Sequence, residues 1–293
     1  MKHDEGFRNE ALARALDGAI AGTPLPLYDL LARASGLPGT RINRGVVEAF
    51  ASECAARGKK ADRLIRDMIQ LEADRAPGGT ALEVLPVCGV AAVAARAVSE
   101  PASRREALGL LHDASDDFRF RVREAVPQAL ASIGQSLGDT LLHEVGEWMD
   151  GFFHAAAVLL ALASPGWLGT LKEESLVLER LDQAFSLLRN AARASSRYPG
   201  YKALIDALLI APREVAIRFG TPAFDLLVAW TKEKDPALRE LIHKAVESPK
   251  LTGRFSSEIV RVKAALKGTD PIPRDPTIIV QGTRGRGRKA KRR

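Results

Sequence analysis

Histidines and carboxylates recur at helical spacing between His143 and His154. His143 and Glu147 are four residues apart, as are Asp150 and His154, so each pair could share one side of a helix. Imidazole and carboxylate groups are ordinary ligands of transition metals. The segment has no HExxH pattern, however, and Gly151 interrupts it between the two pairs. We therefore expect exposed polar residues around a turn, with no metal and no cofactor.

Aromatic residues surround one of these carboxylates. Trp148 precedes Asp150 by two residues, and two phenylalanines follow it. Aromatic faces attract cationic groups, and a carboxylate stabilises the positive charge that develops when a bond breaks. The remaining tryptophans, Trp167 and Trp230, also lie near predicted helix ends. These residues are candidates for a pocket, and packing at corners between helices is the alternative explanation for them.

The elements that must position these groups are helices. Alanine, leucine, arginine and glutamate fill most segments, glycine and proline mark the turns, and no alternating strand of useful length occurs. About fifteen helices with short links favour an all-α fold in which antiparallel helix pairs stack as an α-solenoid. The predicted helices cover residues 6–20, 25–34, 43–57, 60–74, 80–98, 104–113, 117–133, 138–149, 152–163, 173–194, 200–210, 212–219, 222–232, 235–247 and 255–266.

Several residues predict how these helices begin or bend. Ser103 and Glu106 have the spacing of a capping box. Thr221-Pro222 places a proline at a first helical position, where it is favoured. Asp235 can accept the free amide hydrogens at the start of the next helix. Pro127 should kink the helix that contains it.

The clearest repeat-like pattern is D-x-x-x-x-VRxAxxxALxxIG, which begins at Asp117. Its apolar residues fall on one helical face, and Gly134 is expected to end the helix. The pattern resembles the second helix of a HEAT repeat, and weaker similarities occur at 64–69, 152–163 and 235–242. The resemblance covers about residues 60–250 and implies an armadillo-like helical fold. It also implies that Arg123 and Arg239 have structural roles, bonding the aspartate of a neighbouring repeat.

Some HEAT-like bacterial proteins are DNA glycosylases that remove alkylated purines, and the segment around Asp150 resembles their cleft. The resemblance implies that Trp148 and Trp230 line a pocket for a cationic base and that Asp150 is the catalytic carboxylate. That family tends to present arginines to DNA after its aromatic pair. In this sequence the aromatic pair is followed by His154 and then by the uncharged stretch Ala155–Val158, which departs from the family's pattern.

Positive charge is concentrated at the C-terminus. The net charge is +7, and seven of the 43 basic residues lie in the last eleven positions, so the rest of the chain holds 36 basic and 36 acidic residues. Such a basic segment is typical of proteins that bind an acidic polymer. Three prolines and alternating glycine favour a disordered tail over 268–293, after a helical repeat domain over 1–267. Its candidate nucleic-acid-binding residues are Arg284, Arg286, Arg288, Lys289, Lys291, Arg292 and Arg293.

A second basic group is predicted within the body. Arg189, Arg193 and Arg197 recur every four residues and would form a basic stripe along one helix. This stripe could contact nucleic acid, or it could be a solvated helix surface.

The remaining features concern the compartment. Cys54 and Cys88 stand in alanine-rich surroundings without CxxC spacing, so we expect buried free thiols in a reducing compartment. The polar N-terminus does not resemble a signal peptide. We expect no apolar run that approaches the ~18 residues of a membrane span. These observations predict a cytoplasmic protein without a membrane partner.

Together these features predict a non-catalytic HEAT-like scaffold. Its concave face would hold a protein partner, and its tail would anchor it to DNA or RNA. The alternatives are an alkylpurine DNA glycosylase and a scaffold that binds proteins alone.

Overall fold

The computed structural model describes residues 2–268, and this part of the chain consists of helices and connecting loops without a strand. The all-α prediction is confirmed. The α-helices are α1 (Lys2–Ile20), α2 (Leu25–Ala34), α3 (Arg44–Arg57), α4 (Asp62–Ile69), α5 (Val84–Ser99), α6 (Arg104–Ser115), α7 (Phe120–Leu137), α8 (Asp139–Glu144), α9 (Phe152–Leu162), α10 (Pro165–Leu168), α11 (Glu174–Arg189), α12 (Pro199–Phe219), α13 (Thr221–Trp230), α14 (Pro236–Val246), α15 (Pro249–Thr252) and α16 (Ser256–Gly268). The 3-10 helices are η1 (Gly58–Ala61), η2 (Ala81–Glu83), η3 (Pro101–Ser103), η4 (Gly146–Asp150) and η5 (Arg193–Arg197).

The predicted tail, apart from its first residue Gly268, falls outside the described residues. The last described helix, α16, ends at Gly268, one residue past the predicted domain boundary. All seven basic residues that were assigned to nucleic-acid binding in the tail lie beyond it.

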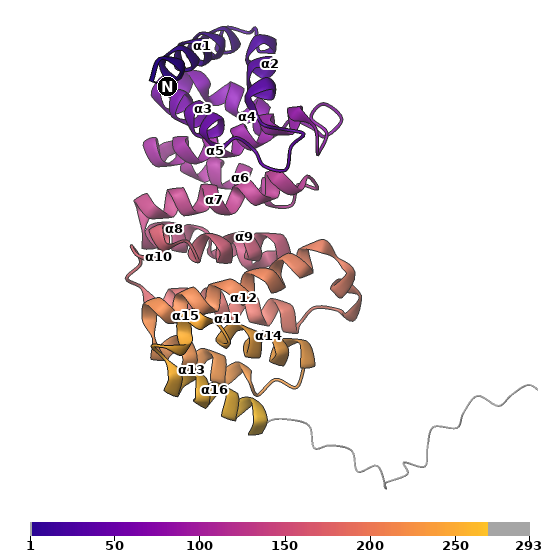
Figure 1. Ribbon diagram of the computed structural model, residues 1–293, viewed down its shortest axis with the longest axis vertical. Coiled ribbons are helices and arrows are strands. Elements are labelled where there is room, and N and C mark those ends of the chain that lie inside the picture. The colour runs from indigo at the N-terminus through magenta and orange to yellow at the C-terminus, as the bar shows by residue number, and fades with distance from the viewer. Residues whose placement is uncertain (1, 269–293) are drawn as a thin grey trace, which may run out of the picture.

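The helices follow one another along the long axis of the molecule, from α1 and α2 at one end to α13 and α16 at the other (Figure 1). One row of helices in mutual contact runs through α3, α5, α7, α9, α12 and α14. The helices between them in sequence, including α4, α6, α11 and α13, pack against this row, and α4 also contacts α6 as α11 contacts α13. Each helix therefore packs mainly against the layers directly above and below it.

Contacts between successive layers join residues that are about one helix pair apart in sequence. Arg66 Nε donates to Glu106 Oε1 at 2.9 Å across a separation of 40 residues, and Arg104 contacts Glu144 across another 40. Arg96 Nε donates to Asp62 Oδ1 at 2.7 Å across 34 residues. Polar bonds at this separation recur along the whole stack.

Helix α5 lies within the core of the first half. It contacts α3, α4, α6 and α7, and most of its side chains are buried. Because it faces apolar neighbours on several sides, it is apolar over nearly its whole surface. Within the described residues, Ala81–Ser99 is a helical stretch long and apolar enough to cross a membrane, and its window is mostly buried inside the protein. The expectation that no apolar run approaches this length was wrong.

Several predicted helix boundaries need correction. Residues 200–219 form the single helix α12, which continues through Pro212, rather than two helices. The helix predicted over 173–194 ends at Arg189. The helix predicted over 138–149 is divided into α8 and η4. Helix α7 continues past Gly134 to Leu137 and contains Pro127 in its interior. The short helices α10 and α15 were not predicted.

Two of the three start signals are confirmed. Asp235 Oδ1 accepts from the amide nitrogens of Ala237 and Leu238 at 2.7 and 3.4 Å. Helix α13 has proline in its first turn, as predicted. The capping box was wrong, because Ser103 has helical backbone angles and its hydroxyl donates to the carbonyl oxygen of Glu100 instead.

Both cysteines are free and fully buried, as predicted. Burial raises the pKa of Cys54 to about 12, and it also raises the pKa of Cys88. Neither thiol is therefore poised as a nucleophile at neutral pH.

Candidate functional site

Three side chains that can bind metals meet where α6 approaches the start of α9. His112 Nε2 lies 3.1 Å from one oxygen of Asp150, and His154 Nδ1 lies 2.8 Å from the other. The two imidazole rings are stacked, with centroids 3.7 Å apart and an angle of 28° between their planes. One possible ligand atom from each residue lies within 4.8 Å of the others. We call this group the His–Asp–His cluster.

The local backbone explains why these residues converge. Asp150 is the last residue of η4, and Gly151 follows with extended angles (φ −146°, ψ 155°), so the chain changes direction between them. Helix α9 begins at the next residue, which places His154 in its first turn, close to Asp150. A Cβ at residue 151 would lie 2.8 Å from His154 Nδ1. The space beside that nitrogen therefore depends on glycine.

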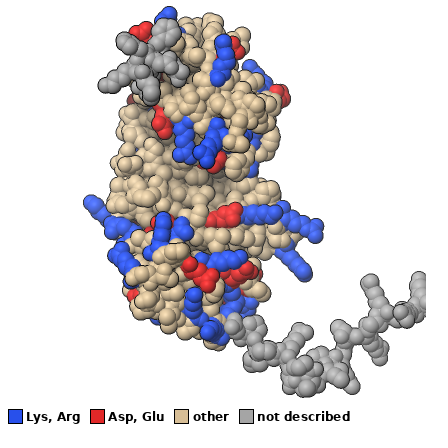
Figure 2. Space-filling view, viewed as in Figure 1, with Lys and Arg blue, Asp and Glu red and all other residues tan. Residues whose placement is uncertain are grey.

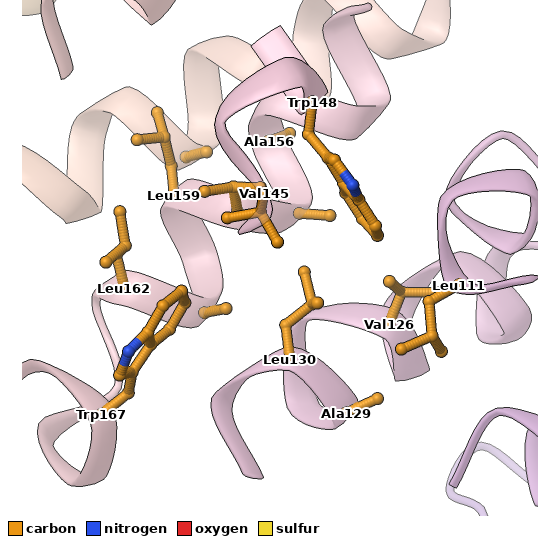
Figure 3. Close-up of a cluster of buried hydrophobic side chains, with 14 of the residues drawn as sticks. Leu111, Val126, Ala129, Leu130, Val145, Trp148, Ala156, Leu159, Leu162 and Trp167 are labelled. Carbon is orange, nitrogen blue, oxygen red and sulfur yellow. The ribbon is translucent and has the colours of Figure 1, made fainter. Parts of the chain in front are cut away.

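Trp148 forms the floor of the cluster. Its ring meets the His112 ring edge-on, with centroids 5.0 Å apart and planes at 85°, and the His154 ring at 6.4 Å. The tryptophan is only 5% exposed. Figure 3 shows its ring directed into the same apolar group as Leu111 and Val126. The buried Trp148 ring thus limits the orientations of both imidazole rings.

The cluster is open to solvent on the side of its carboxylate. The side chains of His154, His112 and Asp150 are 15%, 29% and 52% exposed. Partial burial raises the pKa of Asp150, but hydrogen bonds and charge interactions with His154 and His112 outweigh this effect and lower the pKa below its ordinary value. The carboxylate is thus held in the ionised form that a cation would bind.

The predicted segment is brought together only in part. Asp150 and His154 meet, as their spacing indicated. His143 instead pairs with Glu173, with 3.0 Å between Nε2 and Oε2, and both side chains are largely exposed. Gly151 separates the two predicted pairs, as expected.

The two tryptophans proposed for a base pocket occupy separate buried positions. Trp230 is 6% exposed, stacks on Phe185 at 5.3 Å, and donates from Nε1 to Asp182 at 2.8 Å. Trp148 packs beside the histidines in another layer. Trp167 is fully buried and donates to the carbonyl oxygen of Gly138 at 3.1 Å. All three tryptophan rings are therefore packed in the buried interior. The carboxylate of Asp150 interacts with His112 and His154.

The predicted basic stripe was wrong. Arg189 is the last residue of α11, and the chain leaves the helix before Arg193 and Arg197, which belong to η5. Arg189 also pairs with Glu233 at 3.2 Å and lies over the Trp230 ring. The three residues therefore do not follow one helical face.

Arg123 and Arg239 bind the main chain. The Arg123 guanidinium donates to the carbonyl oxygen of Asp117 and lies 4.6 Å from the centre of the Phe153 ring. Arg239 is buried and donates to the carbonyl oxygens of Thr231 and Leu266. These bonds differ from the contact that the resemblance implied, because they go to main-chain carbonyl oxygens rather than to the aspartate of a neighbouring repeat, and that of Arg123 lies within its own segment.

A groove runs over α3, α5 and α7 and has a volume of about 1070 Å³. Small side chains from the middle helix form its floor, because α5 presents Ala91, Ala94 and Ala95 there. The lining residues advance together along the three helices, from Arg44, Val87 and Arg121 to Ser52, Ala95 and Ser132. The groove therefore follows the direction of these helices.

Positively and negatively charged side chains line the edges of this groove. Arg41, Arg44 and Glu48 stand on one side, and Glu124 stands on the other; all four are exposed. None of them forms an ion pair with another described residue. At the end of the groove, Arg121 is held by the buried Glu83, with 2.9 Å between Nη1 and Oε2. The groove is thus apolar at its base and charged at its rims.

Two features of these sites were missed from the sequence. His112 lies 38 residues before Asp150, so only the stacking of layers brings it near. The groove depends on several alanines at helical spacing in α5, a pattern that also describes any closely packed helix. Compared with protein families, curated proteins and solved structures, the chain matches none.

Proposed function

We propose that this chain is a non-catalytic, HEAT-like α-solenoid scaffold that holds a protein segment in the α3–α5–α7 groove. The repeat assignment is supported by the polar bonds between successive layers, whose sequence separations of 34 to 48 residues include the HEAT period of about 40 to 47. The observation that carries the binding role is the groove itself, with its alanine floor and unpaired rim charges.

The chemistry of the groove suits a short peptide segment. An apolar floor with polar rims is typical of surfaces that hold a helix or an extended peptide, because apolar anchors are buried while the edges fix orientation. Rim charges of both signs favour a partner that carries complementary charges of both signs.

The second part of the proposal assigns nucleic-acid binding to the basic C-terminal segment. Within residues 2–268, most arginines that bond to a residue of another helix or loop form an ion pair with an aspartate or glutamate. The Arg66–Glu106 and Arg96–Asp62 pairs are examples. On the face shown in Figure 2, basic side chains form separate groups with acidic neighbours and wide uncharged areas between them. This face therefore offers little continuous positive charge to a phosphate backbone.

Nucleic-acid binding tests this division of labour. The intact chain and a chain ending at Gly282 would be titrated with fluorescent duplex DNA, single-stranded DNA and RNA at two salt concentrations. We expect the intact chain to bind with a salt slope of at most about −6, and the shorter chain to bind at least tenfold more weakly. Equal binding by both chains would place the nucleic-acid surface on the body, whereas no binding by either would leave a scaffold for proteins alone.

The groove is tested separately with peptides selected from a displayed random library on the intact chain. Ala91→Trp fills the groove floor and should abolish binding of most selected peptides. Ala264→Trp, at an exposed position on α16, is the matched control and should retain it. Peptides that bind both variants equally would show that the groove is not the docking surface.

A further inference from the structure

We infer that the His–Asp–His cluster is a binding site for a divalent transition-metal ion such as Zn²⁺. Two imidazoles and one carboxylate are a common ligand set for such ions. The cluster lies outside the groove, and its assignment does not depend on the proposed scaffold role.

The geometry is close to that of a coordination shell. Ligands about 2.1 Å from Zn²⁺ at tetrahedral angles lie about 3.4 Å from one another. The carboxylate oxygens lie 3.1 and 2.8 Å from nitrogens of His112 and His154. Since all three ligand atoms lie within 4.8 Å of one another, small side-chain movements bring them around one ion. A neutral imidazole can coordinate a metal through its unprotonated nitrogen. His112 would therefore coordinate through Nε2 with its proton on Nδ1, and His154 through Nδ1 with its proton on Nε2.

The surroundings also suit an ion. Trp148 supports both rings from the buried side, so the imidazoles lose little freedom when they coordinate. The half-exposed carboxylate of Asp150 leaves a path from solvent. Three protein ligands leave at least one coordination position, which water can fill.

Glycine at position 151 leaves room for the His154 ring beside Asp150. A side chain there would press against His154 Nδ1, the nitrogen that faces Asp150. The glycine angles do not require it, because φ is −146°. A side chain at residue 151 would therefore require the His154 ring to shift from its place beside Asp150.

A bound ion would join two layers of the stack. His112 belongs to α6, whereas Asp150 and His154 flank the junction of η4 and α9. Metal binding should consequently oppose separation of these layers and raise the unfolding temperature.

The test uses the full chain, stripped with EDTA and dialysed. Calorimetric titration with ZnCl₂ should show one ion per chain, and thermal unfolding should shift upward with ZnCl₂ and return after EDTA. Binding of Co²⁺ should give the visible absorption bands of a coordinated ion. His112→Gln and His154→Gln should each weaken Zn²⁺ binding at least 100-fold, since even loss of an outer-shell partner costs about 10–100-fold.

His143→Gln is the matched control, because His143 also pairs with a carboxylate across two layers but has no second histidine beside it. It should bind Zn²⁺ as the unchanged chain does. Asp150→Asn keeps the shape of the cluster but removes the negative charge. This variant replaces the histidine variants in the Zn²⁺-binding test if they fail to fold. No saturable binding up to millimolar ZnCl₂ would overturn the inference, as would equal binding by the folded His112→Gln or Asp150→Asn variants.

Discussion

At the scale of single residues, glycine decides how closely two pairs of helices approach. Gly134 of α7 lies directly against the buried Trp167 ring, and Gly89 of α5 lies against the backbone of Ile69 at the end of α4. Neither glycine has a positive φ, so conformational freedom is not the reason for either. A Cβ at either site would overlap its neighbour. These positions therefore need glycine because of packing.

Gly134→Ala is expected to destabilise the protein. Alanine favours helix by about 1 kcal/mol over glycine, but overlap in a packed core costs about 1–3 kcal/mol. The ring cannot easily withdraw, because Trp167 is fully buried and hydrogen-bonded to Gly138. We expect overlap to win, and urea unfolding should show a net loss of about 1 kcal/mol.

The control for this prediction is Gly109→Ala in α6. A Cβ at that exposed position meets nothing within 4 Å. The helix propensity then acts alone, so the same measurement should show a gain of about 0.5–1 kcal/mol. If both variants were stabilised to the same degree, the packing explanation would be incorrect.

Part of the His–Asp–His cluster could be predicted from the sequence. The spacing of Asp150 and His154 predicts their proximity, because neighbours four apart meet in helical segments. Nothing local connects His112 to them, because the contact depends on how α6 stacks against the next layer. The separation of Trp148 from Trp230 also follows from this stacking. The presence of tryptophans near helix ends was therefore not enough to predict that they line one pocket.

At the scale of elements, packing determines where helices continue. Pro212 removes one backbone donor, and the sequence predicts a break there. Helix α12 nevertheless runs from Pro199 to Phe219, since it packs against α9 on one side and α14 on the other. Burial of a long apolar face outweighs the loss at one turn. Most helices could be predicted from composition and periodicity, but continuity through proline could not.

Helix starts provide a test at this scale. Asp235→Ala removes the carboxylate that accepts two amide hydrogens at the start of α14, and it should cost about 1 kcal/mol in urea unfolding. Ser103→Ala should change stability by less than about 0.5 kcal/mol, because its hydroxyl caps no amide. Equal losses for both would contradict the capping assignments.

At the scale of the whole molecule, stability is distributed along the stack. Each layer packs mainly against its neighbours, and the most extensive contacts join adjacent helices of the row from α3 to α14. In such arrays stability is approximately a sum of layer and interface contributions. The two ends should therefore open with some independence.

The buried thiols can report on this independence. Met68→Ala, beside α5, should accelerate modification of Cys88 by a thiol reagent at least 30-fold, because emptying a buried methionine site costs about 2 kcal/mol or more. Ile242→Ala in α14 removes a similarly buried side chain far along the stack, and it should leave that rate within about twofold. Equal acceleration by both would show that the stack unfolds as a single unit.

Helix α5 also has a consequence for how the protein is made. Ribosomes add about 5–20 residues per second, so the helix leaves the exit tunnel seconds before α7, which covers one side of it. During that interval a segment apolar enough for a bilayer stands partly bare. Newborn chains should therefore attract chaperones or targeting factors at this stage, and slow translation while α7 is still inside the exit tunnel would prolong this exposure.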